Sequence, residues 1–142
     1  MILLDTNVLS ELARPTPDAA VLRWAATVPL GRLWTTAITE AELRFSLALM
    51  PLGRRHAGLA AAVEGVFQRI VHGRVLPFDR SAARAYAGIA AMRRRAGRSV
   101  NTADLQIAAI AQARGVENLV TRNVADFEGC GVSLLNPWQQ PL

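Results

Sequence analysis

Lysine is absent from this chain, in which all 16 basic residues are arginine. The absence excludes mechanisms that need a lysine amine, such as the Walker A phosphate loop, Schiff-base catalysis and the usual lysine-assisted phosphoaspartate sites. With 11 acidic residues, the formal net charge is +5. Arginine binds phosphate oxygens in pairs, so this charge is compatible with a nucleic-acid partner, although codon usage alone also produces chains without lysine.

Cysteine and long hydrophobic runs are equally scarce. Cys130 is the only cysteine, which excludes an internal disulfide and a cysteine metal cluster. No apolar stretch reaches the roughly 18 residues that would span a bilayer, because arginine, proline or glycine interrupts each candidate. No charged-then-apolar leader opens the sequence. We therefore expect a cytoplasmic protein with no membrane segment.

The length and the hydrophobic pattern predict one α/β domain over residues 1–142. A chain of 142 residues, 51% of them hydrophobic, can bury a sizeable core. Short apolar runs alternate with segments of helical period, which indicates a parallel sheet covered on both faces. Strands are expected at residues 2–4, 33–38, 74–78, 119–121 and 132–135. Helices are expected at residues 8–13, 19–26, 40–50, 59–71, 82–95 and 102–113.

Asp5 directly follows the first apolar run and therefore lies at the carboxyl end of a predicted buried strand. Ligands of open α/β sheets bind outside these carboxyl ends, so an acid here faces the usual place of the chemistry. Asp5, Thr6 and Asn7 are also good helix-capping residues. A cap and a site residue are equally compatible with this position.

Glu42 follows the strand expected at residues 33–38. Its segment fits a capping box, with Thr39 as N-cap and Glu42 as the third helical residue. In the first turn after a strand, the same carboxylate would also point toward the carboxyl edge of the sheet. Glu40 competes for this role, but it lies two residues away and should face another part of the helix surface.

Asp104 falls in the first turn of the helix expected at residues 102–113, with Asn101 or Thr102 as its cap. The spacing of Leu105 and Ala108 indicates that this helix is largely buried. A buried carboxylate is costly unless a metal, an arginine or strong donors lie beside it. Asp104 is therefore a candidate for chemistry as well as for helix stabilisation.

Asp126 follows the strand expected at residues 119–121, and Asn123 precedes it by three residues. Either side chain is placed to join the acids at the edge of the sheet. Crowded carboxylates stay ionised at neutral pH only where cations neutralise them, and hard oxygen ligands favour Mg²⁺ or Mn²⁺. We interpret four carboxylates as one acidic metal pocket: Asp5, Glu42, Asp104 and Asp126.

Six groups of residues lie in order along nearly the whole chain: Ile2-Leu3-Leu4-Asp5-Thr6-Asn7, Ala41-Glu42-Leu43-Arg44, Leu76-Pro77-Phe78-Asp79, Asn101-Thr102-Ala103-Asp104 with Ile107-Ala108-Ala109, Thr121-Arg122-Asn123 with Asp126-Phe127, and Asn136-Pro137-Trp138. Together they resemble the PIN-domain ribonucleases, in particular the VapC and FitB toxins of bacterial toxin–antitoxin pairs. The resemblance implies a three-layer α/β/α fold with a central parallel sheet. It also implies a Mg²⁺- or Mn²⁺-dependent endoribonuclease that is blocked by a cognate antitoxin.

The resemblance extends to individual positions. Three residues match the core acids of the family, as direct or water-mediated metal ligands: Asp5, Glu42 and Asp104. The family places its fourth acid where this chain has either Asn123 or Asp126, and Thr6 matches a hydroxyl often found beside the first acid. A metal-activated water would cut the RNA without a protein nucleophile. The implied partners are RNA and a DNA-binding antitoxin.

Two surfaces are assigned from the residue pattern. Arg93, Arg94, Arg95 and Arg98 form the best candidate RNA-facing patch, although a solvated helix end explains them equally well. Apolar residues on the early helices suit either the core or the interface of a homodimer. They include Leu43, Leu47, Leu49 and Leu59.

Two other functions stay open beside the ribonuclease toxin. A PIN-like fold without activity would be a binding module that acts through its antitoxin-type partner, but the intact acid set argues against it. A phosphatase of the haloacid dehalogenase type would use Asp5 as nucleophile. Against it, Asn7 stands where a second acid is expected, and the chain has no lysine. His56 and His72 have no obvious partner for metal-free acid–base catalysis.

Overall fold

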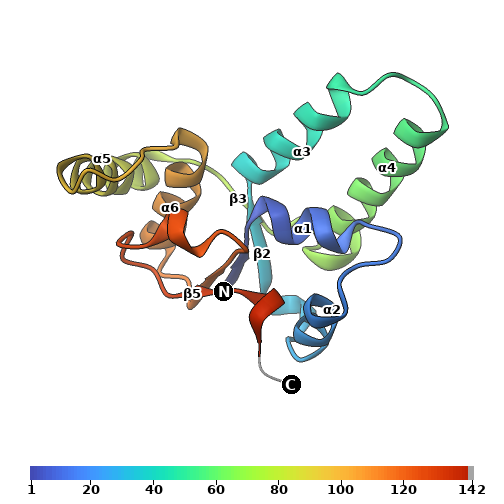
Figure 1. Cartoon of the computed structure of the whole chain (residues 1–142), viewed down its shortest axis with the longest axis horizontal. Helices are drawn as coiled ribbons and strands as arrows, with labels where there is room; N and C mark the ends of the chain where they lie inside the picture. Colours follow the sequence, from blue (N-terminus) through green and yellow to red (C-terminus); the bar gives the residue numbers. More distant parts are fainter. Residues whose placement is uncertain (141–142) are drawn as a thin grey trace.

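The computed structural model describes residues 1–140, which form a parallel sheet between two layers of helices (Figure 1). The strands are β1 (Ile2–Leu4), β2 (Leu33–Thr36), β3 (Val75–Leu76), β4 (Asn118–Val120) and β5 (Leu134–Leu135). The helices are α1 (Thr6–Leu12), α2 (Ala19–Ala26), α3 (Ala37–Leu49), α4 (Arg54–Gly65), α5 (Arg80–Arg95) and α6 (Thr102–Arg114). Shorter helical segments are η1 (Leu30–Arg32), η2 (Val66–Ile70), η3 (Val124–Phe127) and η4 (Pro137–Gln139). The α/β/α architecture expected from the sequence is confirmed.

Strand β1 lies at the centre of the sheet, whose order is β3-β2-β1-β4-β5. It pairs in parallel with β2 on one side and with β4 on the other. All its residues are buried, as expected for a continuous apolar run inside a parallel sheet. The chain winds outward from β1 to β3 and then crosses to the other side of β1. The direction of winding therefore changes beside β1, and binding crevices of open sheets lie at such points.

The side chains of β1 alternate between two cores, one on each face of the sheet. Leu4 packs into a cluster with residues of the first four helices, such as Val8, Trp24, Leu43 and Val63. Leu3 packs into a second cluster with residues of the last two helices, such as Ile89 and Ala108. Figure 1 shows the corresponding layers, with α1 to α4 on one side of the strands and α5 and α6 on the other.

Several helices begin earlier than the apolar pattern indicated. The prediction of Thr39 as N-cap was wrong, because β2 ends at Thr36 and the Thr36 side chain caps α3, accepting a hydrogen bond from Thr39 N at 3.1 Å. The prediction that the fourth helix begins at residue 59 was also wrong. It begins at Arg54, because polar residues open its exposed first turn and conceal the helical period. Helix α1 begins at Thr6, with Asp5 as its cap.

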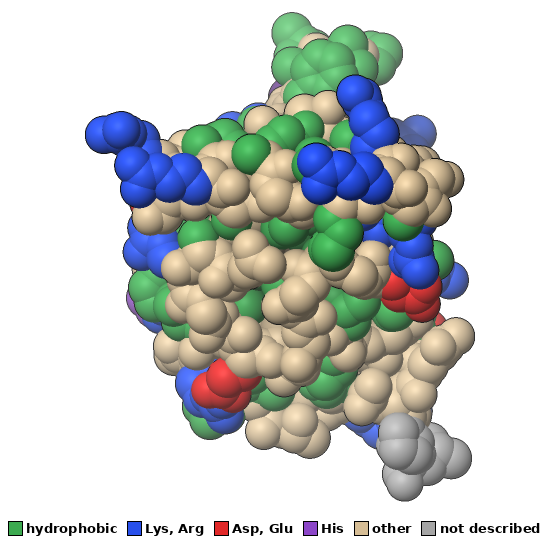
Figure 2. All heavy atoms as spheres, turned by 90° about the vertical axis from the view of Figure 1, so that its left-hand side faces the viewer, with side chains coloured by type: hydrophobic (Ala, Val, Ile, Leu, Met, Phe, Trp, Pro, Cys, Tyr) green, Lys and Arg blue, Asp and Glu red, His purple; other side chains and the backbone are tan. Residues whose placement is uncertain are grey.

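Helices α3 and α4 project from the sheet as an arm with an apolar tip (Figures 1 and 2). Leu52 is 88% exposed, Leu49 69% and Phe45 64%. By contrast, Leu43 and Leu47 lie in the core. Clustered exposed apolar side chains commonly mark contact surfaces, so the tip is a candidate interface. Within residues 1–140, no helix has the length and hydrophobicity that crossing a membrane requires.

Gly115 ends α6 in the left-handed conformation, with φ 61° and ψ 42°. A Cβ would meet no atom there, but the backbone angles disfavour any side chain. We expect Gly115→Ala to lower the free energy of unfolding by about 1 kcal/mol. Gly88 lies within α5, where a Cβ also meets no atom and where alanine favours the helix. Gly88→Ala should therefore raise the free energy of unfolding by up to about 1 kcal/mol. Urea unfolding measures both, and changes of the same sign would contradict this explanation.

Candidate metal centre

Asp5 is buried at the carboxyl end of β1, with 3% of its surface exposed. Its Oδ1 accepts a hydrogen bond from Thr6 N at 2.8 Å. Its Oδ2 accepts one from Thr121 Oγ1 at 2.8 Å and one from Asn7 Nδ2 at 3.3 Å. Burial raises the pKa of the Asp5 carboxyl, against the lowering effect of the Thr121 and Thr6 donors. Asp5 therefore caps α1 while its carboxylate lies close enough to Glu42 and Asp126 to be affected by their charges.

Glu42 lies in the second turn of α3, the helix that follows β2, and its carboxylate lies beside Thr6. Its Oε1 accepts a hydrogen bond from Thr6 Oγ1 at 2.6 Å. Thr6 thus touches two carboxylates, Asp5 through its backbone N–H and Glu42 through its hydroxyl. Glu40 pairs with Arg44. It therefore faces another part of the helix surface, as its offset of two residues predicted.

Asp104 lies in the first turn of α6, where Asn101 is the cap and its Oδ1 accepts a hydrogen bond from Asp104 N at 3.0 Å. Burial raises the pKa of the Asp104 carboxyl to about 6. This value includes the smaller raising effect of the negative charges of Asp5, Asp126 and Glu42 and the lowering effect of the positive charge of Arg93. The four carboxylates therefore share one electrostatic environment, although they come from four separate segments.

The fourth position is divided between Asp126 and Asn123. Asp126 lies in η3, exposed, and its charge also raises the pKa of Asp5. Asn123 is tied to the centre through its backbone, because its N–H donates to Thr121 Oγ1 at 3.0 Å. The charge of Asp126 thus acts on Asp5 and Asp104. Asn123 is linked to Asp5 through two hydrogen bonds that share the Thr121 hydroxyl.

The four carboxylates surround a centre without converging on a point. Within residues 1–140, no three acidic, histidine or cysteine side chains come close enough to hold an ion directly. The donor set nevertheless fits a hard cation, because it consists of oxygen ligands that repel one another. Mg²⁺ in particular keeps several waters and binds through few carboxylates, so it does not need a tight cage of side chains.

Sequence reasoning missed two residues that shape this centre. Thr121 is fully buried one residue after β4, where its hydroxyl donates to Asp5 and accepts from Asn123 N. Its position beyond the carboxyl end of a strand was a usable signal. Arg93 was placed in an exposed RNA-facing patch, and this was wrong.

Arg93 is 4% exposed and braces two of the acid-bearing segments. Its Nε donates to Ser99 O at 3.1 Å, just before α6, and its Nη1 donates to Glu128 O at 2.7 Å, just after η3. Arg98 also donates to Glu128 O, at 3.2 Å. The sequence alone does not show which arginine of the run Arg93-Arg94-Arg95 is buried and which are solvated.

Comparison with known proteins gives a family match and relatives that are similar in sequence and in structure. The family model for the PIN domain matches residues 2–128. The chain is 45% identical over 139 residues to VapC ribonuclease Y4jK of Sinorhizobium fredii, covering 98% of this chain and 99% of the relative. It is 38% identical over 138 residues to Toxin FitB of Neisseria gonorrhoeae, covering 97% and 99%. The solved structure of FitAB bound to an IR36 DNA fragment has a TM-score of 0.89 at 36% identity, covering 100% of this chain and 99% of that one.

Burial and, to a smaller extent, the charges of the neighbouring acids predict a pH-dependent penalty at Asp104. Its folded pKa of about 6 exceeds the ordinary 3.8, so the penalty is absent at low pH and develops as the pH rises through this interval. In EDTA above about pH 7, Asp104→Asn should raise the free energy of unfolding by about 1 kcal/mol, after allowance for solvent screening. Near pH 4 the two proteins should be equally stable. Urea titrations at both pH values test this, and a less stable variant at neutral pH would contradict it.

Arg93 should contribute strongly to stability. Arg93→Met keeps the length of the side chain but leaves the carbonyls of Ser99 and Glu128 without this donor, at a cost of about 3 kcal/mol. Arg98→Met is the matched control, because Arg98 is exposed and contacts only Glu128, through its carbonyl and through a surface ion pair with its carboxylate, and it should cost less than about 1 kcal/mol. Equal midpoints of thermal unfolding for the two variants would refute the bracing role.

Proposed function

This chain belongs to the PIN-domain family, and on that premise we propose that it is an endoribonuclease and the toxin of a toxin–antitoxin pair. One observation carries the proposal: the carboxylates of Asp5 and Glu42 share the donors of Thr6 at the carboxyl edge of the sheet, where burial and then the charges of neighbouring acids raise the pKa of Asp5 and of Asp104. Ionised acids in such a setting repel an RNA backbone unless a cation lies between them. The relatives named above, a ribonuclease and a toxin, support this activity.

We propose Mg²⁺ or Mn²⁺ as the cofactor, held by Asp5, Glu42 and Asp104, with Asp126 as the fourth carboxylate and Asn123 as its alternative. When bound, the ion would neutralise the acids, activate a water and stabilise the charge that develops on the phosphate. Mutual repulsion among the acids supports the assignment, because a divalent cation relieves it.

The neutral residues of the centre hold the carboxylates in place. Both oxygens of Asp5 accept hydrogen bonds, so the carboxylate cannot rotate without losing Thr6 or Thr121. Glu42 is oriented by the same Thr6. Fixed acids favour catalysis because they need no rearrangement as the reaction proceeds. With water as the nucleophile, we expect products that carry a 3′-hydroxyl and a 5′-phosphate.

The proposed partners are an inhibitory antitoxin and a second copy of the chain. A groove between α1 and α4 is lined by Ala13, Pro15, Arg55 and Leu59, and would accept an apolar segment of an antitoxin with an acidic group beside it. The exposed leucine and phenylalanine side chains at the tip of the arm suit a homodimer. We place the activity in the cytoplasm, where cellular RNA is available. The structural likeness to FitAB supports the antitoxin partner.

A second candidate is a binding module without activity. The observation in its favour is that no three acidic, histidine or cysteine side chains of residues 1–140 converge as a ready chelating group. The module would keep the fold and its partner and would cleave no RNA, whether or not a metal is bound.

Asp5→Asn separates the two candidates. Asparagine caps helices as well as aspartate does, so α1 should persist while the negative charge is lost. We expect cleavage of cellular RNA in Mg²⁺ or Mn²⁺ to fall by about 100-fold or more, and cleavage by the native chain to stop in EDTA. Sequencing of the product ends measures both the cleavage and its chemistry.

Asp18→Asn is the matched control, because Asp18 also caps a helix, α2, and accepts from Ala20 N at 2.8 Å. This variant should retain full activity. A folded native protein that binds Mn²⁺ but cleaves no RNA would favour the binding module. Products that end in a 2′,3′-cyclic phosphate would rule out the proposed attack by water.

A further inference from the structure

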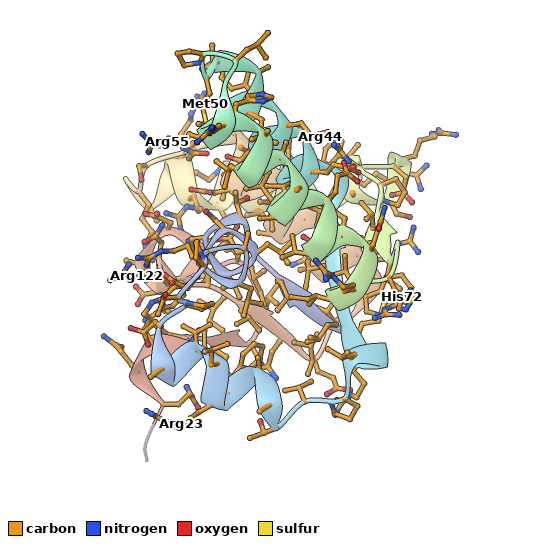
Figure 3. All side chains as sticks on the ribbon, turned by 90° about the vertical axis from the view of Figure 1, so that its right-hand side faces the viewer. Arg23, Arg44, Met50, Arg55, His72 and Arg122 are labelled. Carbon is orange, nitrogen blue, oxygen red and sulfur yellow. The ribbon has the colours of Figure 1, made fainter. Side chains whose placement is uncertain are left out.

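Arg122 is an exposed arginine whose backbone and side chain are both held in place. Its backbone N–H donates to Asn7 Oδ1 at 3.1 Å, and its carbonyl accepts from Asn136 Nδ2 at 3.4 Å. Its guanidinium carbon lies 5.0 Å from the centre of the Trp138 ring. Figure 3 shows it at the edge of the molecule, well separated from Arg23. Long surface side chains are usually mobile, so this anchoring sets Arg122 apart.

Two hydrogen-bonded routes link Arg122 to the acidic centre. Thr121, its neighbour in the chain, donates to Asp5 Oδ2. Asn7, which binds the Arg122 backbone, donates to the same oxygen. Arg122 is therefore fixed at the rim of the centre by the same residues that hold its most buried carboxylate.

The guanidinium of Arg122 keeps its donors available. A cation–π contact uses the face of the guanidinium plane and leaves the N–H groups at its edge free. Within residues 1–140, no carboxylate lies within 4.0 Å of this side chain, whereas Arg44 and Arg114 are paired with acids. An anchored guanidinium with free edge donors is suited to bind a planar pair of anionic oxygens.

We propose that Arg122, held by Trp138, is a phosphate-binding site that grips the RNA backbone beside the bond to be cut. The inference rests on the proposed ribonuclease function and specifies where the substrate is held. Arg122 supplies exposed positive charge beside a centre in which four carboxylates would repel the phosphates of an RNA strand. Trp138 orients the guanidinium before the RNA arrives, which reduces the entropy lost on binding.

The test measures binding of a fluorescein-labelled, mixed-sequence, single-stranded RNA by anisotropy across a series of salt concentrations. All proteins carry Asp5→Asn, so that the RNA stays intact. Mg²⁺ is present to neutralise the remaining acids. Adding Arg122→Ala should weaken binding about tenfold and reduce the logarithmic salt slope by about 0.7, as expected for one lost phosphate contact on a single strand. Arg122→Lys should retain the slope but lose affinity, because lysine cannot bind two oxygens in parallel.

The role of Trp138 is tested in the same assay. Trp138→Leu should weaken binding about threefold, and should have no further effect when Arg122 is already alanine. Arg23→Ala is the matched control, since it removes an equal charge from an exposed helical position and should change affinity by less than about twofold. Thermal unfolding of each variant verifies the fold.

The possible failures are distinguishable. If Arg122→Ala and Arg23→Ala behave alike, or if the Trp138→Leu effect persists in full beside Arg122→Ala, the phosphate site is overturned while ribonuclease activity stands. If the native chain cleaves no RNA but binding depends on Arg122 as described, the proposed function fails and the phosphate site is retained. Failure to bind RNA under any salt condition overturns the site itself.

Discussion

The buried carboxylate of Asp5 sets conditions that the surrounding structure has to meet. A charge at the end of a central strand, with almost no contact with water, needs donors from the protein itself. Thr6 supplies one as the chain turns into α1, and Thr121 supplies another from across the sheet. Thr121 lies there only because β4 pairs with β1 in the register that sets Val120 beside Leu4. The register of the central strands and the electrostatics of the site are therefore coupled.

The ends of three helices face the same set of acids. Helix α1 begins at the carboxyl end of β1, α3 begins directly after β2, and the first turn of α6 carries Asp104. Each helix amino terminus presents partial positive charge, which offsets part of the repulsion among the carboxylates. This explains how one fold keeps four acids near one another before any cation is bound. It also explains why helix-capping residues and candidate ligands are interleaved, as with Asp5 and Asn101.

Sequence patterns predicted the elements that depend on local apolar runs and failed where tertiary contacts decide. The strand 2–4 and the helix carrying Asp104 were identifiable because burial imposes a periodic apolar pattern on them. The start of α3 was not, since Thr36 and Thr39 are both good caps and only the length of β2 selects between them. Asp5 and Asp126 were identifiable as candidates because they follow strands, and Asp104 because it opens a largely buried helix. Burial of Arg93 and anchoring of Arg122 depend on partners distant in sequence, which no local pattern reveals.

Both outer strands of the sheet are only two residues long, Val75–Leu76 at one edge and Leu134–Leu135 at the other. Pro77 follows the first of them and offers no N–H to a neighbouring chain. An edge this short is a poor template for adding a strand from another molecule. The fold therefore resists polymerisation through its sheet. Association with other chains is left to helical and apolar surfaces, from which a partner can dissociate and rebind without exposing a sheet edge to amyloid-like growth.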